Sequence, residues 1–259
     1  PPESLMRLYQ AWAEGGAGLI ITGNVMVDSR AMTGPGGVVL EDDSQLARFR
    51  QWAQIGRSHG AQFWMQINHP GRQMRANLGQ QTWAPSAVAL DLGKMSKHFG
   101  TPREMSEDNI AELIRRFART AQLAEQAGFT GVEVHAAHGY LLHSFLSPLS
   151  NQRTDAFGGD LAGRMRFPLE VFDAVRAAFP ADKPVWVRLS ATDWVAGGWD
   201  IEGSVALSQA LKARGWEKVI AVDLDDRRLE LARKLGAEEV FNAKQEGLAM
   251  HIRQICGGD

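Results

Sequence analysis

Apolar and polar positions follow one another along the chain in blocks that predict strands and helices in turn. Continuous apolar runs predict buried strands at 16–27, 61–68, 131–135 and 183–190. Stretches with helical spacing lie around them and predict helices at 3–14, 43–59, 107–126, 163–179 and 202–214. The last part of the chain predicts strand 216–223, helix 225–235, strand 238–243 and a helix near 245–255.

This order of strand and helix predicts an α/β fold with parallel strands and crossover helices. A (βα)8 TIM-type barrel, partial or rearranged, and an open doubly wound sheet are both compatible with the pattern. Polar residues at the ends of three strands favour the barrel, because the carboxyl ends of barrel strands converge on one mouth. These residues are Gln66 and Asn68, His135 and His138, and Arg188 and Ser190. The long segment 69–105 is expected to be a functional loop.

Composition narrows the class of protein. The chain has 259 residues, 44% of them apolar, and its net charge of −2 gives no electrostatic case for nucleic acid or a membrane surface. No apolar run approaches the roughly 20 residues that span a bilayer. A single cysteine, Cys256, excludes an internal disulfide framework and fits a reducing, cytoplasmic compartment. The start lacks Met and is polar and aromatic rather than signal-like, so we expect a fragment or a processed product.

The spacing His135-x-x-His138-x-Tyr140 lies where a strand turns into its loop. Two imidazole N–H groups can stabilise negative charge that develops on one oxygen, and a phenol is a weak acid that can protonate a carbanion. The group therefore suits the reduction of an activated alkene. The alternative is that the histidines are hydrogen-bonded core or turn residues and Tyr140 fills the rim. A metal site is not expected, since no H-E-x-x-H and no carboxylate pair at ligand spacing occur.

Several motifs resemble the old yellow enzyme family over about residues 5–214. They are QINHPGRQ (66–73), EVHAAHGYLLHSFLSPLSNQRTDAFGG (133–159), GRMRFPLE (163–170) and VWVRLSATDWVAGGWDIEGS (185–204). This family consists of FMN-dependent NAD(P)H:flavin oxidoreductases, or ene-reductases. The resemblance implies an FMN cofactor, NAD(P)H as reductant and a small-molecule substrate, an α,β-unsaturated carbonyl or nitro compound.

The same resemblance implies roles for individual residues. His135 and His138 would bind the substrate oxygen, and Tyr140 would be the proton donor. Three residues would contact the flavin, namely Gln66 at the pyrimidine edge, Arg188 beside N1 and O2, and Asn24 near the isoalloxazine. Taken without the family, Gln66 could equally be a strand-end amide and Arg188 the partner of Glu133 in an ion pair.

Residues 216–259 resemble instead the nucleotide-binding domain of medium-chain zinc alcohol dehydrogenases. There a strand ending in an acidic residue, here Asp223, precedes a helix of the type D-x-x-R-L-E-L-A. No glycine-rich turn precedes it, so we interpret Asp223 as capping helix 225–235 rather than binding a ribose. The sequence thus predicts a chimera: a barrel portion at 1–215 and a Rossmann-like βαβα segment at 216–259.

Such a chimera would lack the family's first strand and its phosphate-binding loops. Open sheet edges must then be covered, for example by a second copy of the chain in a homo-oligomer. Three functions follow from these patterns. The first is an ene-reductase whose activity is impaired by the missing loops. The second is a non-catalytic βα scaffold with weak or no flavin binding, and the third is an NAD-binding fragment of the alcohol dehydrogenase type.

Overall fold

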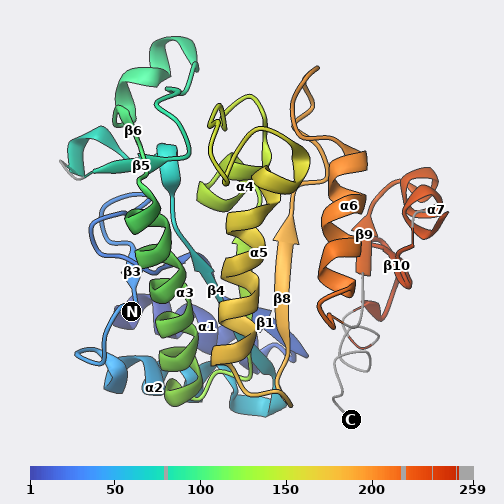
Figure 1. Cartoon of the computed structure of the whole chain (residues 1–259). Helices are drawn as coiled ribbons and strands as arrows, with labels where there is room; N and C mark the ends of the chain where they lie inside the picture. Colours follow the sequence, from blue (N-terminus) through green and yellow to red (C-terminus); the bar gives the residue numbers. More distant parts are fainter. Residues whose placement is uncertain (79–80, 217–219, 235, 249, 251–259) are drawn as a thin grey trace. The chain divides into compact units, whose positions relative to one another are not determined.

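The computed structural model describes residues 1–78, 81–216, 220–234, 236–248 and 250 (Figure 1). Two compact units make up the chain, residues 1–199 and 200–259, and each is taken by itself below. They part between Trp199 and Asp200, whereas the two resemblances in the sequence change near residue 215.

The first unit alternates strands with helices, as the apolar pattern predicts. Its helices are α1 (Glu3–Glu14), α2 (Leu46–Gly56), α3 (Glu107–Ala127), α4 (Leu141–Leu146) and α5 (Leu161–Ala178). Its strands are β1 (Leu19–Ile21), β2 (Val25–Met26), β3 (Val38–Val39), β4 (Gln62–Asn68), β5 (Thr82–Ala84), β6 (Pro102–Glu104), β7 (Gly131–Ala136) and β8 (Val185–Leu189).

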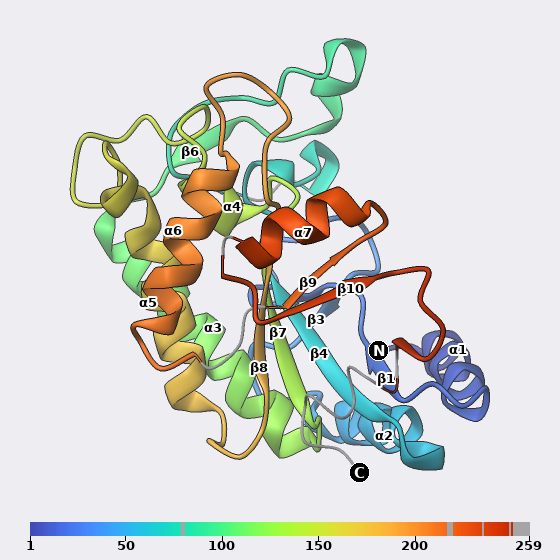
Figure 2. The same ribbon diagram turned by 90° about the vertical axis from the view of Figure 1, so that its right-hand side faces the viewer.

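One parallel sheet carries the unit. Its order is β3-β2-β4-β7-β8, with β1 also paired to β4. Figure 2 shows β4, β7 and β8 running side by side, and α3 and α5 lie along one face of these strands and pack against each other. The predicted α/β fold with parallel strands and crossover helices is therefore correct for this unit.

Strand and helix ends follow from local chemistry. The Ser106 hydroxyl accepts from the Asn109 N–H, and the Asn109 side chain accepts from the Ser106 N–H, so the first turn of α3 is capped. Gly128 ends the helix at φ 93°, a conformation that glycine adopts without strain. The apolar residues of β4 are fully buried on both faces of the sheet: Phe63, Trp64, Met65 and Ile67.

The predicted strand 16–27 is wrong as a single element, because it is two short strands. β1 and β2 both pair with β4, through Ile21↔Trp64 and Val25↔Ile67. Between these two pairs the β1–β2 segment advances four residues (25 − 21), whereas β4 advances three (67 − 64). The extra residue makes a bulge, and the Thr22 hydroxyl accepts the Gln66 N–H that a regular ladder would have bonded. Bulges of this kind re-aim side chains at the rim of a sheet.

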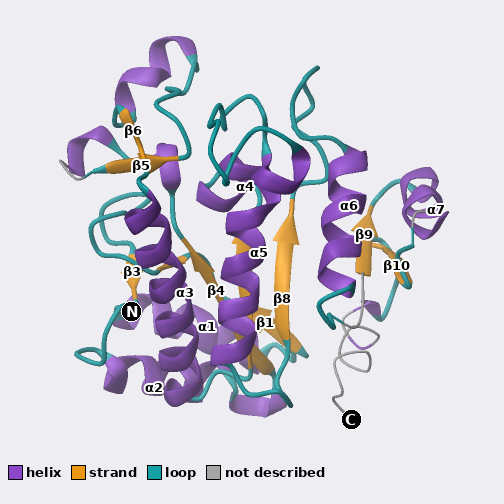
Figure 3. Ribbon diagram, viewed as in Figure 1, coloured by secondary structure: helices purple, strands orange, loops and turns teal. Residues whose placement is uncertain are grey.

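Two loops contain structure that the sequence analysis missed (Figure 3). The segment 69–105 holds the parallel strands β5 and β6, and the segment after β7 holds the short helix α4. Six residues, all buried, form α4, which is too short for a helical period to stand out in the sequence.

The second unit consists of α6 (Ile201–Lys212), β9 (Ile220–Asp223), α7 (Asp226–Lys234) and β10 (Glu239–Asn242). β9 and β10 are parallel neighbours joined through α7, so they form a βαβ unit. The predicted helix near 245–255 falls largely outside the described residues. None of the described helices combines the length and apolar character that a membrane crossing requires.

Candidate active site

The register of three neighbouring strands brings the predicted residues together. Gln66 of β4 stands opposite Glu133 of β7, and His135 of β7 stands opposite Arg188 of β8. Because alternate residues of a strand point to the same face, these four side chains share one face of the sheet. Below them on that face lie Trp64 and Trp186, whose rings meet edge to face at 5.0 Å.

Gln66, Glu133 and Arg188 form the lower layer of the site, and Glu133 lies at its centre. Its Oε1 accepts from Gln66 Nε2 at 2.6 Å and from Arg188 Nε at 2.8 Å, and its Oε2 accepts from Arg188 Nη2 at 3.3 Å. The Glu133 side chain is 4% exposed, whereas the Arg188 side chain is 43% exposed. The ion pair between Glu133 and Arg188 that the sequence suggested therefore forms, and the Arg188 side chain stays partly exposed.

The two histidines and the phenol form the upper layer. His135 Nε2 lies 3.2 Å from His138 Nδ1, and the rings of His138 and Tyr140 each stand edge-on to the His135 ring, with centroids 5.0 Å away. His135 is buried, Tyr140 is half-buried and His138 is exposed. The sequence motif thus becomes one compact cluster that opens to the surface at His138.

Burial keeps these imidazoles neutral. Desolvation, with the nearby His138 and Arg188, lowers the pKa of His135 to about 3, and desolvation also lowers the pKa of His138. The Ala137 N–H donates to Nδ1 of His135, so the neutral ring carries its proton on Nε2. His135 therefore presents an uncharged N–H toward His138.

The turn that presents His138 is strained and is held from several sides. His138 has φ 60° and Gly139 has φ 73°, and a left-handed conformation is unusual for a residue with a side chain. The His138 N–H donates to the Ser190 hydroxyl at 2.9 Å, and its carbonyl accepts from Gln73 Nε2 at 2.6 Å. Two other loops therefore hold the backbone of this turn in place.

A second pair of residues, His143 and Asp193, supports the same turn. The Gly139 N–H donates to His143 Nδ1 at 2.9 Å, and His143 Nε2 lies 2.7 Å from Asp193 Oδ1 without the alignment of a hydrogen bond. Burial works to raise the pKa of Asp193, but the contacts with His143, Ser147 and the Trp199 N–H lower it to about 2. Sequence reasoning missed this pair, since its members are 50 residues apart (193 − 143).

A pocket of about 230 Å³ adjoins this pair. Its lining residues are Arg72, Gly139, His143, Ser144, Ser147, Leu149, Ser150, Asp193 and Val195. Of the two tryptophans in the loop after β8, Trp199 is buried and Trp194 is exposed.

Asn24 occupies the bulge between β1 and β2. Its buried Oδ1 has no hydrogen-bond partner among the residues that the structure describes. The same holds for Oδ1 and Nδ2 of Asn68, at the end of β4. Buried amide atoms of this kind are able to bond to a water or to a ligand group. Within the described part of the chain no cluster of His, Cys, Asp and Glu could hold a metal ion.

Comparison with known proteins gives a consistent picture. Residues 2–256 match the family described as NADH:flavin oxidoreductase / NADH oxidase. An NADH-dependent flavin oxidoreductase of Talaromyces variabilis is 41% identical over 225 residues, which are 81% of this chain and 54% of that protein. The chain thus spans about half the length of the curated relatives it matches, or less.

Two solved structures are similar in fold to this chain. Morphinone reductase in complex with tetrahydroNAD superposes with a TM-score of 0.76 and 27% identity, over 92% of this chain and 77% of that chain. The old yellow enzyme from Pichia sp. AKU4542 gives a TM-score of 0.78 at 24% identity, over 100% of this chain and 72% of the other, a likeness of fold alone.

The comparisons do not support the predicted change of family near residue 215. The family match continues to residue 256, through the segment that resembles an alcohol dehydrogenase. A strand that ends in aspartate before a helix occurs in barrels and in dinucleotide-binding sheets alike, so that pattern does not separate the two. In the structure Asp223 Oδ1 accepts from the Asp225 N–H and so closes the turn before α7.

Proposed function

The chain belongs to the NADH:flavin oxidoreductase / NADH oxidase family, and from this we propose that it is an FMN-dependent, NAD(P)H-consuming reductase of activated alkenes. The substrates would be α,β-unsaturated carbonyl or nitro compounds. One observation carries the proposal: two neutral imidazoles and a phenol stand as one cluster directly above a layer of amide, carboxylate and guanidinium.

The lower layer fits the pyrimidine edge of a flavin, which carries an N–H beside carbonyl oxygens. Gln66 uses its amide N–H on Glu133 and keeps its carbonyl oxygen, while Arg188 keeps N–H groups that Glu133 does not use. Gln66 and Arg188 would hold this edge, and the half-exposed guanidinium suits the charge of a reduced ring. The unsatisfied Oδ1 of Asn24 would be a further contact.

The upper layer fits the substrate. In the structure the Nε2–H of His135 faces Nδ1 of His138 at 3.2 Å. A substrate oxygen between the two rings would replace this contact: it would accept the Nε2–H of His135 and, once His138 shifts to its Nδ1–H tautomer, a second hydrogen bond from Nδ1. These donors would stabilise the negative charge that the oxygen gains during reduction. Because both rings are neutral, they would bind the oxygen without protonating it.

Bound FMN, once reduced by NAD(P)H, would supply the hydride to the β-carbon of the alkene. The π-electron pair would move toward the α-carbon and the oxygen that the histidines hold. Tyr140 would then give its O–H proton to the α-carbon, and its phenolate would regain a proton from water, which reaches this half-buried ring. The product is the saturated carbonyl or nitro compound.

The test is uptake of the cofactor. The purified protein, mixed with FMN and desalted, is expected to stay yellow. Arg188→Met should raise the dissociation constant for FMN about tenfold, because it removes charge-assisted hydrogen bonds. Arg166→Met, which changes an exposed arginine of α5, is the matched control and should bind FMN like the unmodified chain.

A second candidate is a βα scaffold that binds flavin weakly or not at all. The observation in its favour is that Gln66 and Arg188 already have a partner within the chain, Glu133. Under that hypothesis the protein stays colourless after FMN is added, and Arg188→Met lowers only the free energy of unfolding. A colourless protein would therefore rule out the reductase.

A further inference from the structure

Glu133 is the one buried carboxylate between the two proposed flavin contacts, and it is a pure acceptor when ionised. The Arg188 guanidinium donates to it on one side, and the Gln66 amide N–H donates to it on the other. Both of its oxygens are used within this layer. The contacts with Glu133 therefore decide which hydrogen-bonding atoms Gln66 and Arg188 can offer to a ligand.

Gln66 is held in one orientation as a result. Its backbone N–H is fixed on the Thr22 hydroxyl at 2.9 Å, and its side-chain Nε2 is fixed on Glu133 at 2.6 Å. An amide that donates toward Glu133 must direct its carbonyl oxygen away from it. The flipped amide would face the carboxylate with its own oxygen, an acceptor against an acceptor, which is unfavourable.

Arg188, in contrast to Gln66, can offer only hydrogen-bond donors to a ligand. Of the five N–H groups of a guanidinium, the one on Nε and one on Nη2 point to Glu133. The remaining N–H groups do not bond to Glu133, and the Arg188 side chain as a whole is 43% exposed. Gln66 thus offers an acceptor and Arg188 offers donors, on neighbouring sides of one carboxylate.

We propose that Glu133 is a positioning residue that sets this acceptor–donor order, and that the order selects a planar ring with an imide edge. The inference rests on the proposed function, since the ring would be that of the flavin. The acceptor of Gln66 would take the ring N3–H, and the donors of Arg188 would take a ring carbonyl oxygen. Glu133 itself would touch neither ring nor substrate.

The role differs from simple neutralisation of Arg188. A carboxylate that only balanced charge would affect the stability of the protein and leave the choice of ring unchanged. A carboxylate that fixes the amide of Gln66 makes binding depend on the N3–H. The two roles are therefore separated by an analogue that lacks this hydrogen, N3-methyl-FMN.

The experiment measures dissociation constants for FMN and N3-methyl-FMN by quenching of flavin fluorescence. For the unmodified chain we expect FMN to bind at least about tenfold more tightly, because an acceptor without a donor is costly. In Glu133→Gln the new amide can donate or accept, so Gln66 can turn either way and the preference should fall to about twofold or less. Glu125→Gln, which breaks the surface pair of Glu125 with Lys183 (3.1 Å), is the control and should keep the full preference.

A second variant protects the test against poor folding of Glu133→Gln. Gln66→Met removes the acceptor and leaves the ion pair of Glu133 and Arg188, and it should lose the preference for N3–H as well. Retention of the preference in either variant, folded by circular dichroism, would overturn the role of Glu133 while leaving the proposed function intact. Failure of the unmodified chain to bind FMN at all would overturn both.

Discussion

Tyr140 stands half-buried beside the His135 ring, at the start of α4, where its hydroxyl is the nearest phenol to the two imidazoles. The chain has one other tyrosine, Tyr9, whose oxygen accepts from the Gly23 N–H in the bulge between β1 and β2. Of the two phenols, Tyr140 is therefore the one that belongs to the candidate site.

Tyr140→Phe separates the two half-reactions of the proposed enzyme. It keeps the ring packing on His135 and removes only the O–H, so reduction of the flavin by NADH should keep its rate. Oxidation of the reduced flavin by an unsaturated ketone should slow by about 10²- to 10⁴-fold, the usual contribution of a general acid. Stopped-flow absorbance measures both steps, and an equal loss in both would contradict the assignment.

The sequence identified residues that could carry chemistry, but it did not identify the loop residues that contact them. The strand-tip pattern indicated His135, His138, Tyr140, Gln66 and Arg188, because each lies at the end of an apolar run. It did not indicate His143, Asp193 or Gln73, because their contacts depend on how separate loops meet. The roles predicted for the site residues stay predictions, namely those of His135, His138, Tyr140, Gln66, Arg188 and Asn24.

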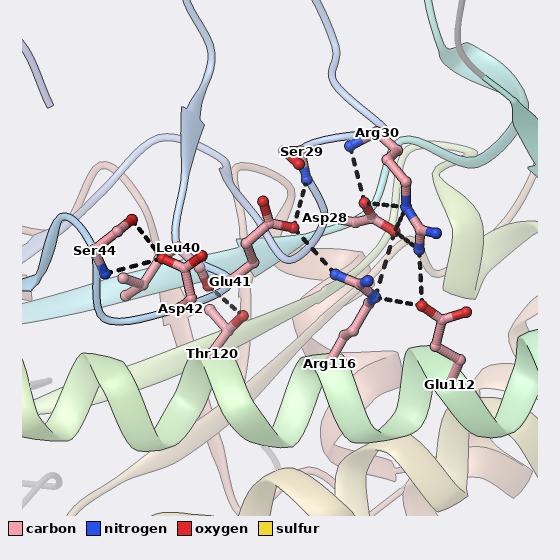
Figure 4. A network of polar contacts seen from close by, with 10 residues as sticks. All are labelled: Asp28, Ser29, Arg30, Leu40, Glu41, Asp42, Ser44, Glu112, Arg116 and Thr120. Carbon is pink, nitrogen blue, oxygen red and sulfur yellow. Dashed lines mark hydrogen bonds and ion pairs between the residues drawn. The ribbon is translucent and has the colours of Figure 1, made fainter.

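At the scale of elements, one polar network joins helix α3 to the loops after β2 and β3 (Figure 4). Asp28, 1% exposed, receives hydrogen bonds from Arg30, and Arg116 of α3 lies 3.6 Å from it. Arg116 also contacts Glu112 at 2.9 Å and Glu41 at 3.1 Å. Burial favours a higher pKa for Asp28, yet its contacts with Arg30 and Arg116 hold that pKa below its usual value.

Arg116→Met should lower the free energy of unfolding by about 1–3 kcal/mol near neutral pH, because it leaves a buried carboxylate with one cation fewer. The pKa of Asp28 is depressed in the folded state, so its ionisation stabilises the fold above about pH 4 and ceases to do so as the pH falls. The difference between the two proteins should narrow below that pH.

Urea unfolding at several pH values measures this difference. Arg115→Met changes an exposed arginine one position away on α3 and is the control, with an expected change within about 0.5 kcal/mol. If both substitutions cost the same, the network around Asp28 contributes nothing specific to stability.

Elements with long, regular patterns were predictable, and interrupted ones were not. Helix α3 has a cap and a closing glycine in its sequence, and it runs over almost the predicted range. The bulge at Thr22 was missed although Thr22, Gly23 and Asn24 interrupt the apolar run 19–26, because the bulge itself depends on the Thr22 hydroxyl meeting β4. The short strands β5 and β6 were also missed, as three residues carry no period.

At the scale of the whole chain, the family match runs through both compact units, from residue 2 to residue 256. The βαβ unit of β9, α7 and β10 is the part of the second unit that invited the comparison with dehydrogenases. One prediction is still untested: that a homo-oligomer covers the edges of the sheet at β3 and β8. Also untested is the impaired activity expected from missing phosphate-binding loops, in a chain that spans 54% of its relative from Talaromyces variabilis.

The most direct test of the central claim is a crystal structure of the chain soaked with FMN and an α,β-unsaturated ketone. The account predicts the pyrimidine edge of the ring against Gln66 and Arg188, and the ketone oxygen within hydrogen-bond distance of His135 and His138. A ring bound away from β4 and β8, or a ketone oxygen that faces neither imidazole, would contradict it.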